Sequence, residues 1–386
     1  MKFLALPVLL TAAFSLLAAP AGGKPAQRPA PTAAKAPQIA GDPEELGEFA
    51  DFTQWTGVPE FIDQMVEKHD FPRPEVEDAL RKARYVELAI QLVKPAPPGK
   101  PKNWAAYRAR FLDPVRIKTG VAFWNDHEEA LARAERQYGV PAEIIIGILG
   151  VETIYGRNTG KFRVMDAITT LAFAYPETPN RKARMEYFRG ELENTLLFAR
   201  DSGIDPFTLL GSYAGAIGLP QFMPGSILRY AVDFDGDDKI DLRQSPQDAI
   251  GSIASFLSRH GWKRGEPIAF PAGVTAATDG ETPDWKRFIG QPLEAKFRLE
   301  ELKQHGISVS DDVPTNLGYG LVDLQNGFDP TEYWLGTANF YAIAHYNRSF
   351  FYAMSVVELG RAVRNARGGA QDEPPRNINA QARPAP

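Results

Sequence analysis

A chain of 386 residues with 44% hydrophobic residues can bury a large core, enough for two subdomains. Its formal net charge of −5 at pH 7 argues against a protein that binds nucleic acid or another polyanion. The chain contains no cysteine, which excludes disulfides and cysteine-bound metal, and its five histidines lack the spacing of metal ligands, which disfavours a zinc hydrolase.

The N-terminal segment has the pattern of a signal peptide. Lys2 precedes an apolar stretch that is too short and too broken by Pro7 to span a membrane well, and Ala19-Pro20-Ala21 offers a cleavage site. We therefore predict a signal peptide at 1–21 and export of a soluble protein to the periplasm. The Pro- and Ala-rich residues 22–43 are expected to form a disordered linker, and 368–386 a disordered tail. Residues 44–367 are expected to form the folded domain, as a monomer.

Apolar periodicity predicts a mainly helical domain. In chain order, the expected helices cover Trp124 to Tyr138 with Gly139 as its stop, Val140 to Thr153, Arg184 to Ser202, Ser245 to Gly261, and Phe340 to Arg364. Short apolar runs punctuated by Pro, Gly and Thr are confined to about 267–321. This region is expected to form a small α/β insertion in a helical core.

The helix expected after Gly139 ends in a candidate catalytic acid. Pro141 suits its first turn, and apolar residues at helical spacing predict a face buried in the core. Glu152 follows at the buried end, where desolvation raises the pKa of a carboxyl group and keeps it protonated near neutrality, as a general acid requires. The alternative is a helix-terminal glutamate that turns to solvent or meets an arginine.

An acidic loop from Asp233 to Asp241 has the spacing of a calcium site. Counted from Asp233, carboxylates stand at the first, third, fifth and ninth positions, and the Lys239 carbonyl at the seventh. The sixth position is Asp238 instead of the usual glycine, and Gln244 stands where the closing glutamate is usual. Either Asp241, or Asp248 of the next helix, is therefore expected to complete the site. We predict one structural calcium, or sodium, against the alternative of a solvated acidic turn. The candidate ligands are Asp233, Asp235, Asp237, Lys239, Asp241 and Asp248.

Three separated segments carry a resemblance to a known family. They are Gly150-Val151-Glu152-Thr153, the stretch from Gly211 to Pro224, and the stretch from Asn339 to Asn347. In this order they closely resemble the lytic murein transglycosylase B family, glycoside hydrolase family 103. The resemblance implies a lysozyme-like helical core with a small inserted α/β subdomain and an EF-hand-like loop. Some relatives are lipoproteins anchored through a cysteine, so this chain resembles a soluble variant without a membrane anchor.

The same resemblance implies a lytic transglycosylase that works with one acid and no catalytic cofactor. Glu152 would protonate the oxygen between N-acetylmuramic acid and N-acetylglucosamine, and the muramoyl C6 hydroxyl would close onto C1 to give a 1,6-anhydro end. Ordinary glycosidases need two carboxylates, about 5–5.5 Å or about 6.5–9.5 Å apart. Folding could bring Asp166 or Glu186 close to Glu152. A hydrolytic muramidase and a non-catalytic peptidoglycan-binding protein therefore remain alternatives.

The resemblance also implies which residues of this chain bind the substrate. Ser212 and Gln221 match the wall of the glycan cleft. Asn339 begins the third motif and is expected to bind the substrate or to position Glu152, and Tyr341 beside it is expected to bind the substrate. Tyr107 matches a cleft-lining tyrosine. The expected partners are peptidoglycan glycan strands and proteins of cell-wall synthesis or turnover. A segment with Arg184 and Tyr187 matches a muramoyl- or peptide-contacting one, although relatives have two adjacent arginines where this chain has Ala183-Arg184. For each tyrosine the alternative is a core aromatic.

Overall fold

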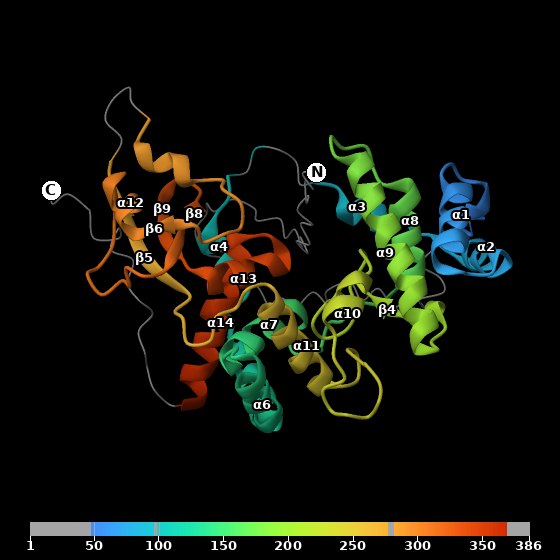
Figure 1. Cartoon of the computed structure of the whole chain (residues 1–386), viewed down its shortest axis with the longest axis horizontal. Helices are drawn as coiled ribbons and strands as arrows, with labels where there is room; N and C mark the ends of the chain where they lie inside the picture. The colour runs from blue at the N-terminus through green and yellow to red at the C-terminus, as the bar shows by residue number, and fades with distance from the viewer. Residues whose placement is uncertain (1–47, 50, 96–98, 100, 277–281, 369–386) are drawn as a thin grey trace, which may run out of the picture.

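The computed structural model describes residues 48–49, 51–95, 99, 101–276 and 282–368 (Figure 1). The predicted signal peptide and linker, and the predicted tail beyond Gly368, lie outside the described residues. Within the described part, no helix is both long enough and apolar enough to cross a membrane.

Helices make up most of the described chain. Those that precede the larger sheet are η2 (Phe52–Gln54), α1 (Val58–His69), α2 (Arg73–Lys82), α3 (Glu87–Val93), α4 (Trp104–Arg108), α5 (Pro114–Asp126), α6 (Glu128–Tyr138), α7 (Ala142–Thr153), α8 (Val164–Ala174), α9 (Arg181–Ser202), η3 (Pro206–Thr208), α10 (Pro224–Tyr230) and α11 (Pro246–Arg259). Two short antiparallel pairs join them, β1 (Glu48–Phe49) with β2 (Arg84–Tyr85), and β3 (Phe162–Arg163) with β4 (Leu210–Gly211).

The α/β insertion is an antiparallel sheet in the order β6-β8-β9-β5-β7. Its elements are β5 (Ala269–Val274), η4 (Asp284–Phe288), β6 (Phe297–Arg298), α12 (Leu299–Gln304), β7 (Ile307–Ser308), β8 (Gly318–Asn326) and β9 (Asp329–Gly336). The strands extend to Gly336, beyond the expected limit at Leu321. The sequence does not reveal β9, because it begins with Asp329-Pro330-Thr331-Glu332, in which only the threonine is a strong strand former.

Two predicted helices are each divided in the structure. The stretch from Trp124 to Tyr138 spans the end of α5 and all of α6, with His127 between them outside helical geometry. The stretch from Phe340 to Arg364 divides into α13 (Ala338–Asn347) and α14 (Phe350–Gly368), because Arg348 adopts a left-handed conformation with φ 48°. Other predicted ends are confirmed, since Gly139 terminates α6 with φ 75° and the Ser245 hydroxyl caps α11.

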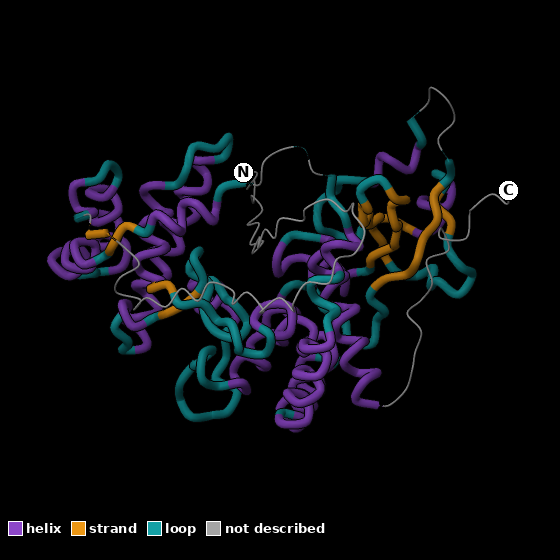
Figure 2. The backbone as a smooth tube through the Cα atoms, turned by 180° about the vertical axis from the view of Figure 1, so that it is seen from behind, coloured by secondary structure: helices purple, strands orange, loops and turns teal. Residues whose placement is uncertain are grey.

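Close packing of α7 against α14 forms the centre of the molecule. A Cβ atom on Gly147 would lie 2.2 Å from the carbonyl oxygen of Val356, and one on Gly360 would lie 2.2 Å from that of Glu143. Only glycine permits such an approach, so these two positions allow the helix backbones to touch. Figure 1 shows the pair between two lobes, one containing the sheet and the other containing α1, α2, α3, α8 and α9. Seen from behind in Figure 2, the larger sheet is confined to its own lobe, which has a separate apolar core.

Candidate active site

Glu152 lies in the last turn of the apolar helix α7. The carboxyl group is surrounded by protein on almost every side, yet the residue keeps partial access to solvent. This burial raises the pKa of Glu152 from 4.5 to about 7, and the nearby Tyr352 hydroxyl partly opposes the shift. The sequence alternatives, a fully solvated glutamate or one paired with an arginine, are not what the structure shows. Glu152 can therefore carry a proton at neutral pH.

The backbone turns sharply after Glu152. Ile154, Tyr155 and Gly156 all adopt left-handed conformations, with φ of 52°, 57° and 87°. For the two residues that are not glycine this conformation costs of the order of 1 kcal/mol each. The turn persists because Thr153 donates its hydroxyl to the Leu219 carbonyl (2.9 Å) and accepts the Gly156 N–H (3.0 Å). The strained turn thus joins the end of α7 to the glycine-rich segment 211–222.

Three tyrosines surround the Glu152 carboxyl. They are Tyr107 of α4, Tyr346 of α13 and Tyr352 of α14. Burial raises the pKa of each hydroxyl, and the negative charge of Glu152 raises it further; the pKa of Tyr107 reaches about 12. The Tyr346 hydroxyl donates to the Pro220 carbonyl at 2.6 Å. The Tyr352 hydroxyl is buried and makes no hydrogen bond of good geometry with any described residue, although it lies close enough to Glu152 to lower its pKa. It is therefore available to a protonated or ionised Glu152.

Sequence reasoning missed Tyr346 and Tyr352. Both follow Asn339 on a stretch that reads as one helix, and a single straight helix cannot aim both at the same point. The break at Arg348 turns α14 relative to α13, and the two rings end up stacked with centroids 6.0 Å apart. The sequence signal for this arrangement is the polar stretch Asn347-Arg348-Ser349 between the two tyrosines, which indicates a break in the helix.

Ser212 and Gln221 lie on the glycine-rich segment beside the strained turn. The Ser212 hydroxyl accepts the N–H groups of Ala214 (3.3 Å) and Ala216 (3.0 Å), and its own hydrogen stays available. The Gln221 amide nitrogen donates to the carbonyls of Thr159 (3.1 Å) and Gly218 (2.9 Å). Both side chains are partly exposed. These bonds fix the conformation of the glycine-rich segment, and Thr153 joins that segment to the end of α7 through the Leu219 carbonyl.

Asn339 and Tyr341 differ from the expectation that they contact substrate. Asn339 is fully buried, and its amide accepts the Lys263 N–H (2.6 Å) and donates to the carbonyls of Lys263 (2.9 Å) and Glu266 (2.8 Å). Tyr341 is 4% exposed and packs its hydroxyl under Gly320 of β8. Both residues anchor α13 to the loop after α11 and to the sheet, because they lie on the side of α13 that faces the core.

Arg184 and Tyr187 lie near the start of α9, away from the tyrosines around Glu152. Tyr187 is close to Glu191, Arg184 and Arg229, and burial raises its pKa. Glu191 is itself buried and accepts the Gly225 N–H at 2.8 Å, at the first turn of α10. Tyr187 is thus partly engaged in the contact between α9 and α10, while Arg184 is partly exposed.

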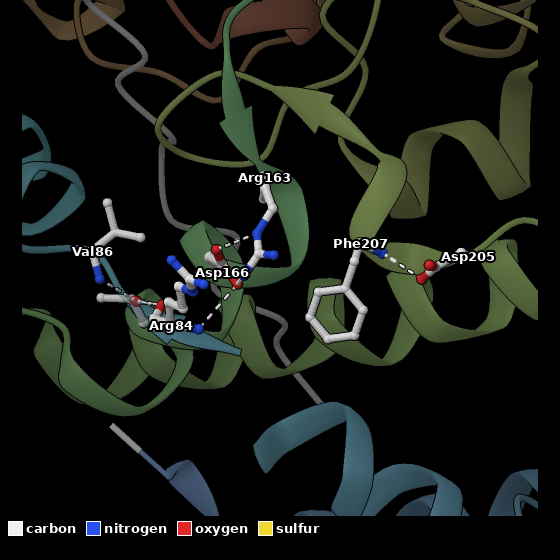
Figure 3. A network of polar contacts seen from close by, with 7 residues as sticks. Arg84, Val86, Arg163, Asp166, Asp205 and Phe207 are labelled. Atoms are coloured by element: carbon white, nitrogen blue, oxygen red, sulfur yellow. Dashed lines mark hydrogen bonds and ion pairs between the residues drawn. The ribbon is translucent and has the colours of Figure 1, made fainter. Parts of the chain in front are cut away.

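Neither Asp166 nor Glu186, the two carboxylates that folding could have brought close, is among the groups that act on Glu152. Asp166 is 3% exposed and accepts two hydrogen bonds from the Arg163 guanidinium (2.7 and 2.9 Å) and one from the Arg84 N–H (3.0 Å). Figure 3 shows this network beside β3, with Arg163 pointing at Asp166. Glu186 is exposed on α9. No carboxylate is among the groups that shift the pKa of Glu152.

The acidic loop brings three carboxylates together. Oxygens of Asp233, Asp235 and Asp248 lie within 4.8 Å of one another, so Asp248, one of the two expected residues, takes the closing position. Asp248 is almost fully buried and accepts the N–H groups of Phe234 (2.7 Å) and Asp241 (2.8 Å). The other candidates lie outside this group, and the side chains of Asp237 and Asp241 accept N–H groups within their own turns. A cluster of hard oxygen donors of this kind fits calcium.

The chain is similar to known proteins over most of its length. Residues 52–361 match the family described as the Transglycosylase SLT domain. Membrane-bound lytic murein transglycosylase B of Escherichia coli (strain K12) is 42% identical over 326 residues, covering 82% of this chain and 85% of that protein. The structure of the E. coli lytic transglycosylase Slt35 in complex with calcium superposes with a TM-score of 0.70, at 40% identity, and covers 85% of this chain and 99% of that one.

A more distant structure adds a ligand complex. SltB3 from Pseudomonas aeruginosa, in complex with NAG-anhNAM-pentapeptide, is 26% identical with a TM-score of 0.62 and covers 81% of this chain and 78% of its own. Together with the matches above, it confirms the expected fold, a lysozyme-like helical core with a small inserted sheet.

Proposed function

The chain belongs to the transglycosylase SLT domain family, and from that membership we propose that it is a lytic transglycosylase that cleaves peptidoglycan between N-acetylmuramic acid and N-acetylglucosamine. The observation that carries the mechanism is Glu152, a partly accessible carboxyl whose pKa is about 7 at the strained end of a buried helix. A group with a pKa near the working pH donates and accepts a proton equally well. A non-catalytic binding protein would gain nothing from a buried carboxyl group, whose ionised form destabilises the fold.

Glu152 performs both proton transfers. Its carboxyl proton goes to the glycosidic oxygen as the bond to muramoyl C1 breaks, and the N-acetylglucosamine side leaves as an alcohol. The resulting carboxylate then accepts the proton of the muramoyl C6 hydroxyl, whose oxygen bonds to C1 and gives the 1,6-anhydro end. Glu152 ends protonated, no water is consumed, and no catalytic cofactor takes part. The Tyr352 hydroxyl stabilises the carboxylate between the two transfers.

A hydrolytic muramidase is the second candidate, and the surroundings of Asp166 and Glu186 support the transglycosylase over it. Hydrolysis with a water nucleophile uses a second carboxylate near the bond. Asp166 is instead held by Arg163 and the Arg84 backbone, and Glu186 is exposed on a different helix. A single acid therefore favours the transglycosylase.

The remaining site residues have proposed supporting roles. Tyr107, Ser212 and Gln221 border the site around Glu152 and are proposed to contact the sugars. Arg184 and Tyr187 are proposed to contact the muramoyl residue or its peptide, and the relative SltB3 is known in complex with a saccharide that carries a pentapeptide. Domain limits of 44–367, export to the periplasm and a monomeric state are part of the same proposal.

The acidic loop is proposed to hold a structural calcium ion. The carboxylates of Asp233, Asp235 and Asp248 supply the donors that the geometry brings together, and Slt35 is known in complex with calcium. Asp237, the Lys239 carbonyl and Asp241 are proposed to complete the shell. The loop lies between segment 211–222 and α11, so the ion acts on stability rather than on chemistry.

Product analysis tests the function. Purified sacculi are digested with the wild type, with Glu152→Gln and with Glu186→Gln as a matched control on an exposed carboxylate, and the products are identified by mass spectrometry. We expect anhydro-muropeptides from the wild type and the control, and at least a thousandfold loss of turnover in Glu152→Gln with folding retained. Reducing ends would support the muramidase instead, and a fully active Glu152→Gln would remove the single-acid mechanism.

A further inference from the structure

Phe328 exposes its whole side chain at the tip of the hairpin between β8 and β9. Its relative exposure is 101%, against 41–57% for the other large apolar side chains exposed on the described surface. A phenylalanine left in water forgoes the burial that stabilises a folded chain. Single exposed apolar residues are common, so exposure alone does not indicate a binding role for Phe328. The structure of the loop that carries it must be considered as well.

The tip that carries Phe328 is firmly held. Gly327 and Phe328 form a two-residue connection between the paired residues Asn326 and Asp329, and Gly327 has φ 70°, as a type II′ turn requires at its first position. The Gly327 N–H donates to the Lys102 carbonyl at 2.8 Å. The Asn326 side chain accepts the Ala105 N–H, also at 2.8 Å. The ring is thus exposed on an ordered support.

The residues that hold the hairpin tip lead directly into α4, which contains Tyr107 of the candidate active site. Asn103 bridges to Asn326, and α4 begins at the next residue and contacts β8 (Figure 1). Tyr107 lies one helical turn along α4, about 5.4 Å along the axis, and feels the charge of Glu152. The hairpin tip is therefore joined, through residues 102–105, to the helix that places Tyr107 near Glu152.

We propose that Phe328 is an outer saccharide subsite, on which a pyranose ring of the bound glycan strand stacks, away from the bond that is cleaved. The inference rests on the proposed function. An aromatic ring offers a flat apolar face to the C–H face of a sugar and needs no partner charge. The hairpin also carries the acidic residues Asp323, Asp329 and Glu332, which disfavour an anionic lipid surface as the occupant. The subsite makes the enzyme prefer long strands to short ones.

The test compares long, uncrosslinked glycan strands with a tetrasaccharide that contains one cleavable bond. Wild type, Phe328→Ala, Phe328→Trp and the control Val115→Ala, an exposed apolar residue of α5, are assayed for release of anhydro ends. Phe328→Ala is expected to raise KM on long strands roughly three- to tenfold, the range of an aromatic stacking contact, with kcat unchanged. Its kinetics on the tetrasaccharide should equal those of the wild type. Phe328→Trp, which keeps an aromatic ring, and the control Val115→Ala should both have the KM of the wild type on long strands.

Three outcomes would overturn the subsite. An unchanged KM on long strands shows that the ring touches no sugar, and an equal loss on the tetrasaccharide shows an effect on the catalytic centre. Binding of the wild type to phosphatidylglycerol vesicles that Phe328→Ala abolishes, with KM unaltered, assigns the ring to a membrane. Retention of each variant by sacculi is measured in parallel. If the wild type releases no anhydro ends, the proposed function fails, while this retention still decides the role of Phe328.

Discussion

Replacement of Glu152 by glutamine should stabilise the protein in a pH-dependent way. In the unfolded chain the carboxyl group titrates near pH 4.5, and in the folded protein burial raises its pKa to about 7. Between these two values the folded state binds more protons than the unfolded state, so the free energy of unfolding falls as pH rises through this window and stays low above it. The raised pKa corresponds to a cost of about 3 kcal/mol at pH 8.

Glutamine removes the charge and keeps nearly the same shape, although its amide is also buried. We therefore expect Glu152→Gln to raise the free energy of unfolding by about 2 kcal/mol at pH 8. The rise should be much smaller at pH 4.5, where Glu152 is protonated in the folded protein and already half protonated in the unfolded chain. Urea unfolding followed by circular dichroism at both pH values measures the difference, with Glu186→Gln as a control on an exposed carboxylate. An equal effect at the two pH values would refute the idea that Glu152 is held in a desolvating site.

Two further predictions concern the neighbours of the acid and the metal loop. Tyr352→Phe removes the hydroxyl that lowers the pKa of Glu152, so the basic limb of the pH profile of kcat/KM should move upward by about half a pH unit or more; a limb that stays in place would show that the hydroxyl does not reach the carboxylate. Calcium at a hundredfold excess over its Kd should stabilise the wild type by about 2.7 kcal/mol, seen as a higher melting temperature that chelator reverses, and Asp248→Asn should abolish most of this gain. Identical melting curves with calcium and chelator would leave the loop a plain acidic turn.

Local patterns in the sequence were sufficient for several features of the site. The apolar helix with one terminal carboxylate predicts a buried Glu152, and the structure bears out its raised pKa, because desolvation depends mostly on the residues of the same helix and on the core that they form. The helix ends at Gly139 and Ser245 follow from the backbone preferences of those residues. The spacing of the aspartates likewise indicates an oxygen-rich loop, and even its closure by Asp248 is a local matter of one loop and the helix that follows it.

Other features depend on contacts between distant parts of the chain, which the periodicity of one segment does not contain. Asn339 has the residue type of a substrate ligand, but the loop after α11 takes both ends of its amide. Tyr346 and Tyr352 reach Glu152 only because Arg348 breaks the helix and because glycines allow α14 to lie against α7. Whether a polar side chain faces the substrate or the core is decided by which surfaces pack together, and that depends on the free energy of the whole fold rather than of any one segment.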